Sequence, residues 1–178
     1  MKIYTTINEF KQYLINESLD KVLYHGTDKN FTNFKLDSNI SNPMYNNKNT
    51  DNDLGIFFTD NLTMAKWFAK LIEFDPNTGE YINTNTGGRV ITAKLDIKNP
   101  YILQDQIEDV DIDDPGQTYF DLVEEMGGGK KMREKLIQEG FDGVIVKNMN
   151  TNYYEDGDYN LYVVFDPEQI KIINIEVI

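Results

Sequence analysis

The motif Tyr24-His25-Gly26-Thr27 carries the residue types best suited to chemistry in this chain. It contains the single histidine among 178 residues and follows a short apolar run. Histidine donates or accepts a hydrogen bond near neutral pH, threonine adds a hydroxyl, and glycine lets the backbone approach a ligand closely. These residues predict a polar site at the end of a strand over residues 21–24. The alternative is a structural, hydrogen-bonded histidine in a turn that ends the strand.

A second candidate stretch runs from Gly55 to Thr59 and is rich in apolar and aromatic residues. This composition predicts a buried strand. Because side chains alternate along a strand, only one of Phe57 and Phe58 can face a cleft while the other enters the core. Asp60 or Asn61 then caps a helix. The face of this helix that is predicted to pack on the core consists of Leu62, Ala65, Phe68, Ala69 and Ile72.

The strands and helices predicted along the chain indicate one α+β domain over residues 21–178. A helical extension over residues 1–20 is predicted to precede it. A surface loop is predicted at residues 37–53, which are mainly Asn, Asp and Ser, and another at the acidic run 105–114. Further helices are predicted at residues 119–126 and 131–138. Further strands are predicted at residues 90–97, 144–146, 161–165 and 170–177.

The composition excludes several kinds of chemistry. The chain has 17 Lys and Arg residues against 30 Asp and Glu residues, a formal net charge of −13 that repels a nucleic-acid backbone. It has no cysteine, so disulfides, zinc-thiolate sites and thiol nucleophiles are absent, and no metal is expected. We find neither an apolar run of membrane-spanning length nor a secretory leader at Met1. We therefore expect a soluble cytoplasmic protein without a nucleic-acid or membrane partner.

Three separated pieces together resemble the ADP-ribosyltransferase fold. The resemblance is to the H-Y-E branch, which includes poly(ADP-ribose) polymerases, diphtheria-like toxins and small phage or bacterial relatives. The pieces are Leu23-Tyr24-His25-Gly26-Thr27, Gly55-Ile56-Phe57-Phe58-Thr59-Asp60, and Tyr162-Val163-Val164-Phe165-Asp166-Pro167-Glu168-Gln169-Ile170. The segment Gly140-Phe141-Asp142-Gly143-Val144-Ile145 also looks like the small members. The resemblance implies two packed, mostly antiparallel sheets with flanking helices.

The same resemblance implies a role for individual residues. His25 would hydrogen-bond a ribose hydroxyl of NAD, the Gly26 backbone would hold the nicotinamide amide, and Thr27 would assist nearby. Phe57 stands where the branch has its stacking tyrosine. Phe68 stands where a second aromatic closes the other face of the nicotinamide ring. The loop at residues 37–53 would lie over this donor site.

The third catalytic position departs from the pattern, because Leu161 stands where the branch usually has glutamate. Breaking the bond between nicotinamide and ribose passes through an oxocarbenium-like state, which a carboxylate stabilises and a leucine does not. Ala65 also stands where some relatives have a serine that bonds the nicotinamide amide. A substitute carboxylate would come from the acceptor or from Glu155, Asp156 or Asp158 just upstream. The other reading of these three residues is a solvated acidic turn.

Three functions remain open from the residues and the resemblance. The first is a mono-ADP-ribosyltransferase that takes NAD as substrate, releases nicotinamide and modifies a macromolecule, as a toxin-like phage or bacterial effector would in a host cytoplasm. The acidic composition favours a protein acceptor. The second is an inactive module of this fold that binds NAD, ADP-ribose or a partner protein. The third is an NAD glycohydrolase. The bases that could offset the negative charge near the NAD diphosphate are Lys29, Lys35, Lys48 and Arg89.

Overall fold

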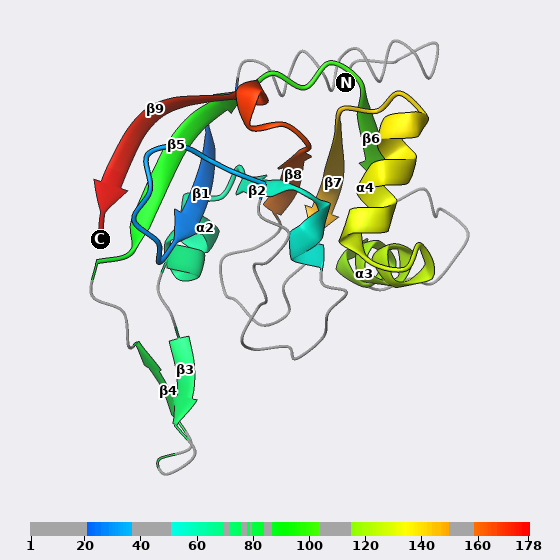
Figure 1. Ribbon diagram of the computed structural model, residues 1–178. Coiled ribbons are helices and arrows are strands. Elements are labelled where there is room, and N and C mark those ends of the chain that lie inside the picture. Colours follow the sequence, from blue (N-terminus) through cyan, green and yellow to red (C-terminus); the bar gives the residue numbers. More distant parts are fainter. Residues whose placement is uncertain are drawn as a thin grey trace, which may run out of the picture.

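Seven strands of the computed structural model form one mixed sheet. They are β1 (Leu23–Thr27), β2 (Ile56–Thr59), β5 (Arg89–Leu95), β6 (Pro100–Leu103), β7 (Gly143–Met149), β8 (Tyr159–Val164) and β9 (Ile170–Val177). Their order across the sheet is β6-β7-β8-β2-β1-β5-β9, so β6 and β9 form opposite edges (Figure 1). The structure describes residues 21–36, 51–69, 72–75, 78, 80–83, 87–103, 115–149 and 159–178.

Helices flank this sheet, and a separate hairpin projects from it. The helices are α2 (Leu62–Ala69), α3 (Pro115–Glu125) and α4 (Gly129–Gln138), with 3-10 turns η1 (Asp51–Leu54) and η2 (Pro167–Gln169). Figure 1 shows α2 against β1, and α3 and α4 beside β6 and β7. The hairpin pairs β3 (Ile72–Asp75) with β4 (Glu80–Asn83). None of the helices in the described part of the chain is long and apolar enough to cross a membrane.

The sheet is weakest at its middle, between β1 and β2. These strands pair through Tyr24 and Thr59 alone, whereas β1 pairs with β5 at five positions, from Leu23–Ala93 to Thr27–Arg89. All described strand pairs are antiparallel except β6–β7. The predicted α+β class and mostly antiparallel pairing are therefore confirmed. The expectation of two packed sheets is not confirmed, because strand pairing joins both halves into one sheet through that single residue pair.

The side chains of the sheet divide between two large apolar clusters because they alternate between its faces. One cluster joins β2, β7 and β8 to α3, α4 and Met64 of α2, and includes Val144, Val146 and Val163. The other lies on the opposite face over β1, β2, β5 and β8. Its members include Leu23, Phe34, Phe58, Ile91 and Tyr162. The candidate site lies at the place where β1 and β2 stop pairing, beyond Tyr24 and Thr59.

Several predicted elements differ from the observed ones. β1 continues to Thr27, so His25 lies inside the strand rather than after it, paired with Ile91. α2 ends at Ala69, which places Ile72 in β3. The predicted helix face is partly wrong, because the buried residues of α2 are Met64, Ala65 and Ala69, whereas Leu62 and Phe68 are exposed. β3, β4 and β6 were not predicted. The strands β2, β5, β7, β8 and β9 and the helices α3 and α4 were predicted close to their observed positions.

Some predictions fall outside the described residues. These are the helix within residues 1–20, residues 37–50 of the polar loop, the acidic run 105–114, and the three carboxylates Glu155, Asp156 and Asp158.

Asp142 and Gln169 connect three turns at one end of the sheet. The Asp142 carboxylate accepts hydrogen bonds from the backbone N–H groups of Lys98 (2.7 Å) and Asn99 (2.8 Å). The Gln169 amide donates to the carbonyl oxygens of Asp142 (2.9 Å) and Asp96 (3.1 Å). These bonds hold the β5–β6 connection, the start of β7 and η2 together, because each satisfies a backbone group that lies outside the strand ladders.

Candidate active site

The His25 imidazole bridges β1 and β2 just beyond their single residue pair. Its Nδ1 lies 2.7 Å from the carbonyl oxygen of Phe57. Three phenylalanine rings surround the imidazole, with centroid distances of 5.0 Å to Phe34, 5.5 Å to Phe58 and 6.2 Å to Phe31. This enclosure holds the ring in one orientation, so only the far side of the imidazole remains for a ligand.

The protonation state of His25 follows from this enclosure. Burial lowers the pKa of His25 below its ordinary value of 6.5, and the Phe57 carbonyl opposes the shift in part. The imidazole is therefore neutral at pH 7. A carbonyl oxygen only accepts, so Nδ1 carries the proton and donates to Phe57. Nε2 is consequently an acceptor, and no described residue supplies it with a hydrogen bond.

Gly26 allows α2 to pack directly on β1. A Cβ atom at this position would lie 1.8 Å from the carbonyl oxygen of Ala65 and 2.8 Å from the backbone nitrogen of Ala69. No side chain fits such a distance, so glycine is required by helix packing as well as by any ligand. The sequence predicts that the Gly26 backbone comes close to a ligand. In the structure the group that lies close to Gly26 is the backbone of α2. This contact holds α2 close against β1 at Ala65 and Ala69.

Thr27 ends β1 with its hydroxyl already engaged. The side chain is buried, and Oγ1 accepts a hydrogen bond from the backbone N–H of Lys29 at 3.1 Å. Such a bond from threonine to the second residue onward stabilises a turn. Thr27 therefore directs the chain away from β1 toward Phe31 and Phe34.

Phe57 and Phe58 face opposite sides of the sheet, as alternation predicts. Phe58 is 1% exposed and enters the core beside His25, whereas Phe57 is half-buried and packs on the opposite face. The structure therefore brings His25 together with the ring of Phe58 and with the main chain of Phe57. Phe68, on α2, is 49% exposed and contacts Trp67 edge-on at 5.1 Å. Phe57 and Phe68 have no ring contact with each other among the described residues.

Leu161 lies in β8 and shares a face of the sheet with Phe57. It pairs with Thr59 of β2 and Val146 of β7, and its half-buried side chain packs against the apolar cluster that contains Met64 and Val163. At this position the described structure places an aliphatic side chain rather than a carboxylate.

Two polar residues that follow β2 position α2 and β8. Asn61 caps α2, since its Oδ1 accepts from the N–H groups of Thr63 (2.9 Å) and Met64 (3.1 Å). Asp60 instead accepts from the backbone N–H of Asn160 at 2.8 Å and from its side-chain amide at 2.5 Å. Of the two predicted caps, Asn61 is the one observed. No sequence pattern indicated the bond between Asp60 and Asn160, which holds the residue next to Leu161.

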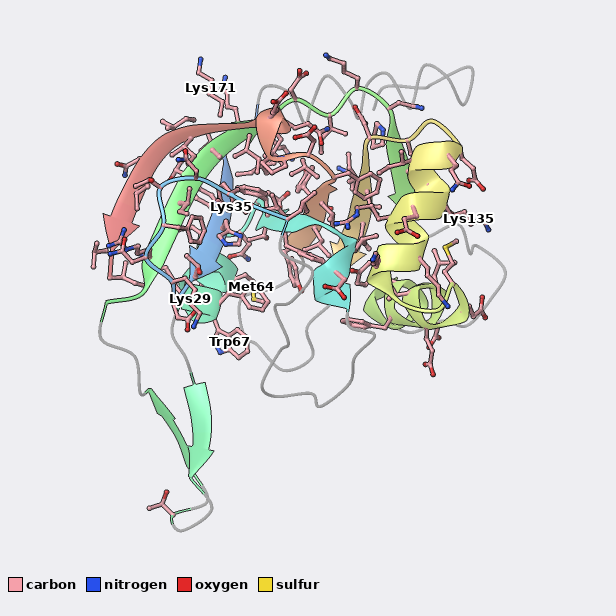
Figure 2. All side chains as sticks on the ribbon, in the orientation of Figure 1. Lys29, Lys35, Met64, Trp67, Lys135 and Lys171 are labelled. Carbon is pink, nitrogen blue, oxygen red and sulfur yellow. The ribbon has the colours of Figure 1, made fainter. Side chains whose placement is uncertain are left out.

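The basic residues near this site differ in their surroundings. Figure 2 labels Lys29 and Lys35 on the segment after β1, and Met64 and Trp67 on α2. Lys29 pairs with Asp28 at 2.6 Å, and Arg89 lies opposite Thr27 on β5. The enclosure by Phe31 and Phe34 was not predicted, although their spacing suits a turn that covers a strand. In the described part of the chain no group of three or more His, Asp or Glu residues could hold a metal.

The histidine-glycine pair of β1 meets β2 through the bond from Nδ1 to Phe57, and α2 follows β2 directly. The chain belongs to the ADP-ribosyltransferase superfamily. The family model described as "ADP-Ribosyltransferase in polyvalent proteins" matches residues 16–177, so the chain is a member of that family. No curated protein matches the chain. Membership assigns the domain to ADP-ribosyl transfer, a reaction that uses NAD as substrate.

Proposed function

We propose that this chain is a mono-ADP-ribosyltransferase of the H-Y-E branch, which transfers ADP-ribose from NAD to a protein acceptor and releases nicotinamide. The donor site consists of His25, Gly26, Thr27, Phe57 and Phe68. Leu161 occupies the third catalytic position. Acidic proteins repel nucleic-acid backbones, so the net charge of −13 favours a protein acceptor.

The observation that carries this proposal is the orientation of His25. Its Nδ1–H donates to Phe57, and the lowered pKa keeps the ring neutral. Nε2 is then a fixed acceptor for a ribose hydroxyl, which is the role that the family resemblance gives to this histidine. A purely structural histidine would satisfy Nδ1 equally well, and NAD binding that depends on Nε2 distinguishes the two roles.

The aromatic residues would position the leaving group. Phe57 and Phe68 come from different elements, and Phe68 already presents about half of its surface to solvent. A nicotinamide ring between them would gain stacking contacts on both faces. The backbone of Gly26 would orient the amide group. Such positioning lowers the barrier because the reacting atoms no longer need to find one another by diffusion.

Leu161 favours a second candidate function, an inactive module that binds NAD, ADP-ribose or a partner protein. A leucine gives no stabilisation to an oxocarbenium-like transition state. Under the first proposal, the missing carboxylate comes from the acceptor protein or from Glu155, Asp156 or Asp158. NAD hydrolysis is a third outcome, in which water replaces the acceptor.

The first experiment titrates the purified protein with NAD and follows thermal stabilisation, nicotinamide release and labelling of protein acceptors. His25→Asn keeps an amide N–H near the position of Nδ1 for the bond to Phe57 and carries no acceptor at the position of Nε2. Leu161→Glu restores the carboxylate. Leu122→Glu is its matched control, because Leu122 is a half-buried leucine that packs against the same cluster from α3.

The transferase proposal expects the wild type to label an acceptor, and His25→Asn to abolish labelling. If the wild type binds NAD without turnover and only Leu161→Glu releases nicotinamide, the inactive module is correct. Nicotinamide release without a labelled acceptor selects the glycohydrolase. If NAD causes neither stabilisation nor release, the donor site proposed at His25 is wrong.

We further propose that residues 21–178 are the catalytic domain and residues 1–20 a helical extension, and that the protein acts in the cytoplasm of a bacterium or of a host. The match over residues 16–177 supports a single domain over nearly the same range. A truncated protein that begins at residue 21 should then unfold in one transition and bind NAD as the full chain does.

A further inference from the structure

The strand β9 forms one edge of the sheet. Among the described strands it pairs with β5 alone, and it lies at the opposite edge from β6 (Figure 1). Two of its apolar side chains are largely exposed, Ile173 at 51% and Val177 at 62%. An exposed strand edge is a template for pairing with another strand, and its side chains decide which strand fits.

Two hydrogen bonds at the ends of β9 determine which backbone groups point outward. The Asp96 N–H donates to the Gln169 carbonyl, and the Ile178 N–H donates to the Gly88 carbonyl, both at 2.8 Å. In an antiparallel ladder, inward and outward groups alternate along the strand. Because the Gln169 carbonyl points inward, the backbone groups of Ile170 and Ile172 point outward. Because the Ile178 N–H points inward, the backbone groups of Val177 and Ile175 point outward.

A β-bulge at the centre of β9 makes its two halves symmetric. Asn174 pairs with Thr92 and Ile172 with Ala93, so Ile173 is the extra residue. The bulge shifts the alternation by one residue. The four residues with outward backbone groups, Ile170, Ile172, Ile175 and Val177, are therefore placed symmetrically in the sequence about the midpoint between residues 173 and 174.

This symmetry permits one antiparallel register between two identical strands. Ile170 of one copy would lie opposite Val177 of the other, and Ile172 opposite Ile175, with outward backbone groups meeting outward groups. The Ile170 N–H already donates to the Pro167 carbonyl within the chain, so Ile170 would offer only its carbonyl oxygen, to the Val177 N–H of the other copy. Pairing with Leu95, Ala93 and Ile91 of β5 shows that Ile170, Ile172 and Ile175 face the same side of the sheet. Without the bulge, this register would oppose outward groups to inward groups and mix the two faces.

The charges of β9 are complementary in the same register. Lys171 of one copy would lie opposite Glu176 of the other, twice by symmetry. Within one chain, Lys171 lies opposite Lys94, an unfavourable pair of like charges, and neither Lys171 nor Glu176 has an ion-pair partner among the described residues. Figure 2 shows Lys171 projecting away from the sheet. These two opposite charges leave β9 neutral overall, so the strand itself adds nothing to the repulsion expected from the net charge of −13.

We propose that two copies of this chain associate through β9, in antiparallel register about the midpoint of residues 173 and 174, to form one continuous sheet. The interface is isologous, since each residue meets its symmetric counterpart in the other copy. The occupant of this edge is therefore a second copy of the same chain.

Charge reversal tests the register. In Lys171→Glu, two glutamates would face each other at each of the two symmetric positions, and in Glu176→Lys two lysines would do so. The dissociation constant of the dimer should therefore rise at least about tenfold in each variant. A mixture of the two variants restores both opposite-charge pairs and should form a heterodimer, as should the double variant with itself. Sedimentation equilibrium over about a hundredfold range of concentration measures each case. Lys130→Glu, an exposed change on α4, is the matched control and should leave association unchanged.

A second pair of variants tests the backbone. Val177→Pro removes an outward N–H, while Val177→Ala removes most of the side chain and keeps that N–H. Only the proline variant should abolish association, and the thermal midpoints of both should stay close to that of a monomeric charge variant. A wild type that is monomeric at every concentration overturns the proposal. Single charge variants that associate as well as the wild type, or a mixture that fails to associate, overturn it also.

Discussion

The Nδ1 of His25 lies 2.7 Å from the carbonyl oxygen of Phe57, and this bond joins β1 to β2 where the two strands no longer pair. The bond leaves the opposite nitrogen of the ring as an acceptor. It also makes the position of the Phe57 main chain depend on the imidazole. One side chain thus closes the weakest junction in the sheet and orients the nitrogen that we propose as the acceptor of the donor site.

The first prediction concerns the dependence of stability on pH. The pKa of His25 is below 6.5 in the folded protein, so the unfolded chain takes up a proton at this residue before the folded chain does. The free energy of unfolding should therefore fall as pH decreases below about 6.5, and this loss should level off below the folded pKa. Well above pH 6.5 the loss should be absent. Urea unfolding of the wild type and of His25→Gln measures the difference, and equal pH dependence in both proteins would contradict it.

The second prediction follows from the same titration and rests on the proposed donor site. Protonation converts Nε2 from an acceptor to a donor, so NAD affinity should weaken as pH falls through the lowered pKa of His25. Proton NMR of the imidazole gives the pKa directly, because the chain has a single histidine. NAD binding should lower this pKa further, since the ligand selects the neutral ring. A pKa that NAD raises or leaves unchanged would argue against hydrogen bonding to Nε2.

The third prediction compares two exposed phenylalanines. Phe68 on α2 and Phe120 on α3 are each 49% exposed and each contact a neighbouring aromatic ring edge-on. Phe68→Ala should weaken NAD binding by about fivefold, because a lost aromatic stacking contact corresponds to about 1 kcal/mol. Phe120→Ala should leave binding unchanged. Calorimetric titration of both variants with NAD measures the contrast, and equal affinities would remove Phe68 from the site.

The fourth prediction concerns the packing of α2 on β1. Gly26→Ala places a methyl group 1.8 Å from the Ala65 carbonyl oxygen, so the helix must shift. We expect a loss of about 2–4 kcal/mol in the free energy of unfolding. Gly140→Ala is the control, since no atom lies within 4 Å of its Cβ and only a φ of +90° opposes the change. The control should lose about 1–2 kcal/mol in denaturant unfolding, and a smaller loss at Gly26 than at Gly140 would contradict the packing argument.

The fifth prediction concerns the turns held by Asp142. Asp142→Ala leaves the N–H groups of Lys98 and Asn99 without their carboxylate acceptor and should cost about 1–3 kcal/mol. Asp142→Asn keeps one acceptor oxygen and should lose less. The free energy of unfolding should decrease in the order wild type, Asp142→Asn, Asp142→Ala, and denaturant unfolding measures it. If the asparagine variant is less stable than the alanine variant, the hydrogen bonds do not account for the effect.

The sequence by itself predicted much of the local structure and the family. Continuous apolar stretches indicated β2 and β8, alternating apolar residues indicated β5, and a cap at Asp60 or Asn61 indicated the start of α2. These signals are readable because periodicity and capping depend on neighbouring residues. The histidine-glycine pair and the stretch containing Phe57 indicated an ADP-ribosyltransferase, and the match over residues 16–177 confirms this class. The resemblance also places Leu161 at the third catalytic position, and this stays a prediction.

The tertiary structure decided how these pieces meet. The extension of β1 through His25, the single pair between Tyr24 and Thr59, and the contact of Gly26 with α2 all depend on residues far apart in the chain. The bulge at Ile173 likewise depends on register with β5. Local patterns fix which residues alternate, but cross-strand register and interatomic distances arise only when distant segments pack, because their energies come from contacts that no local window contains.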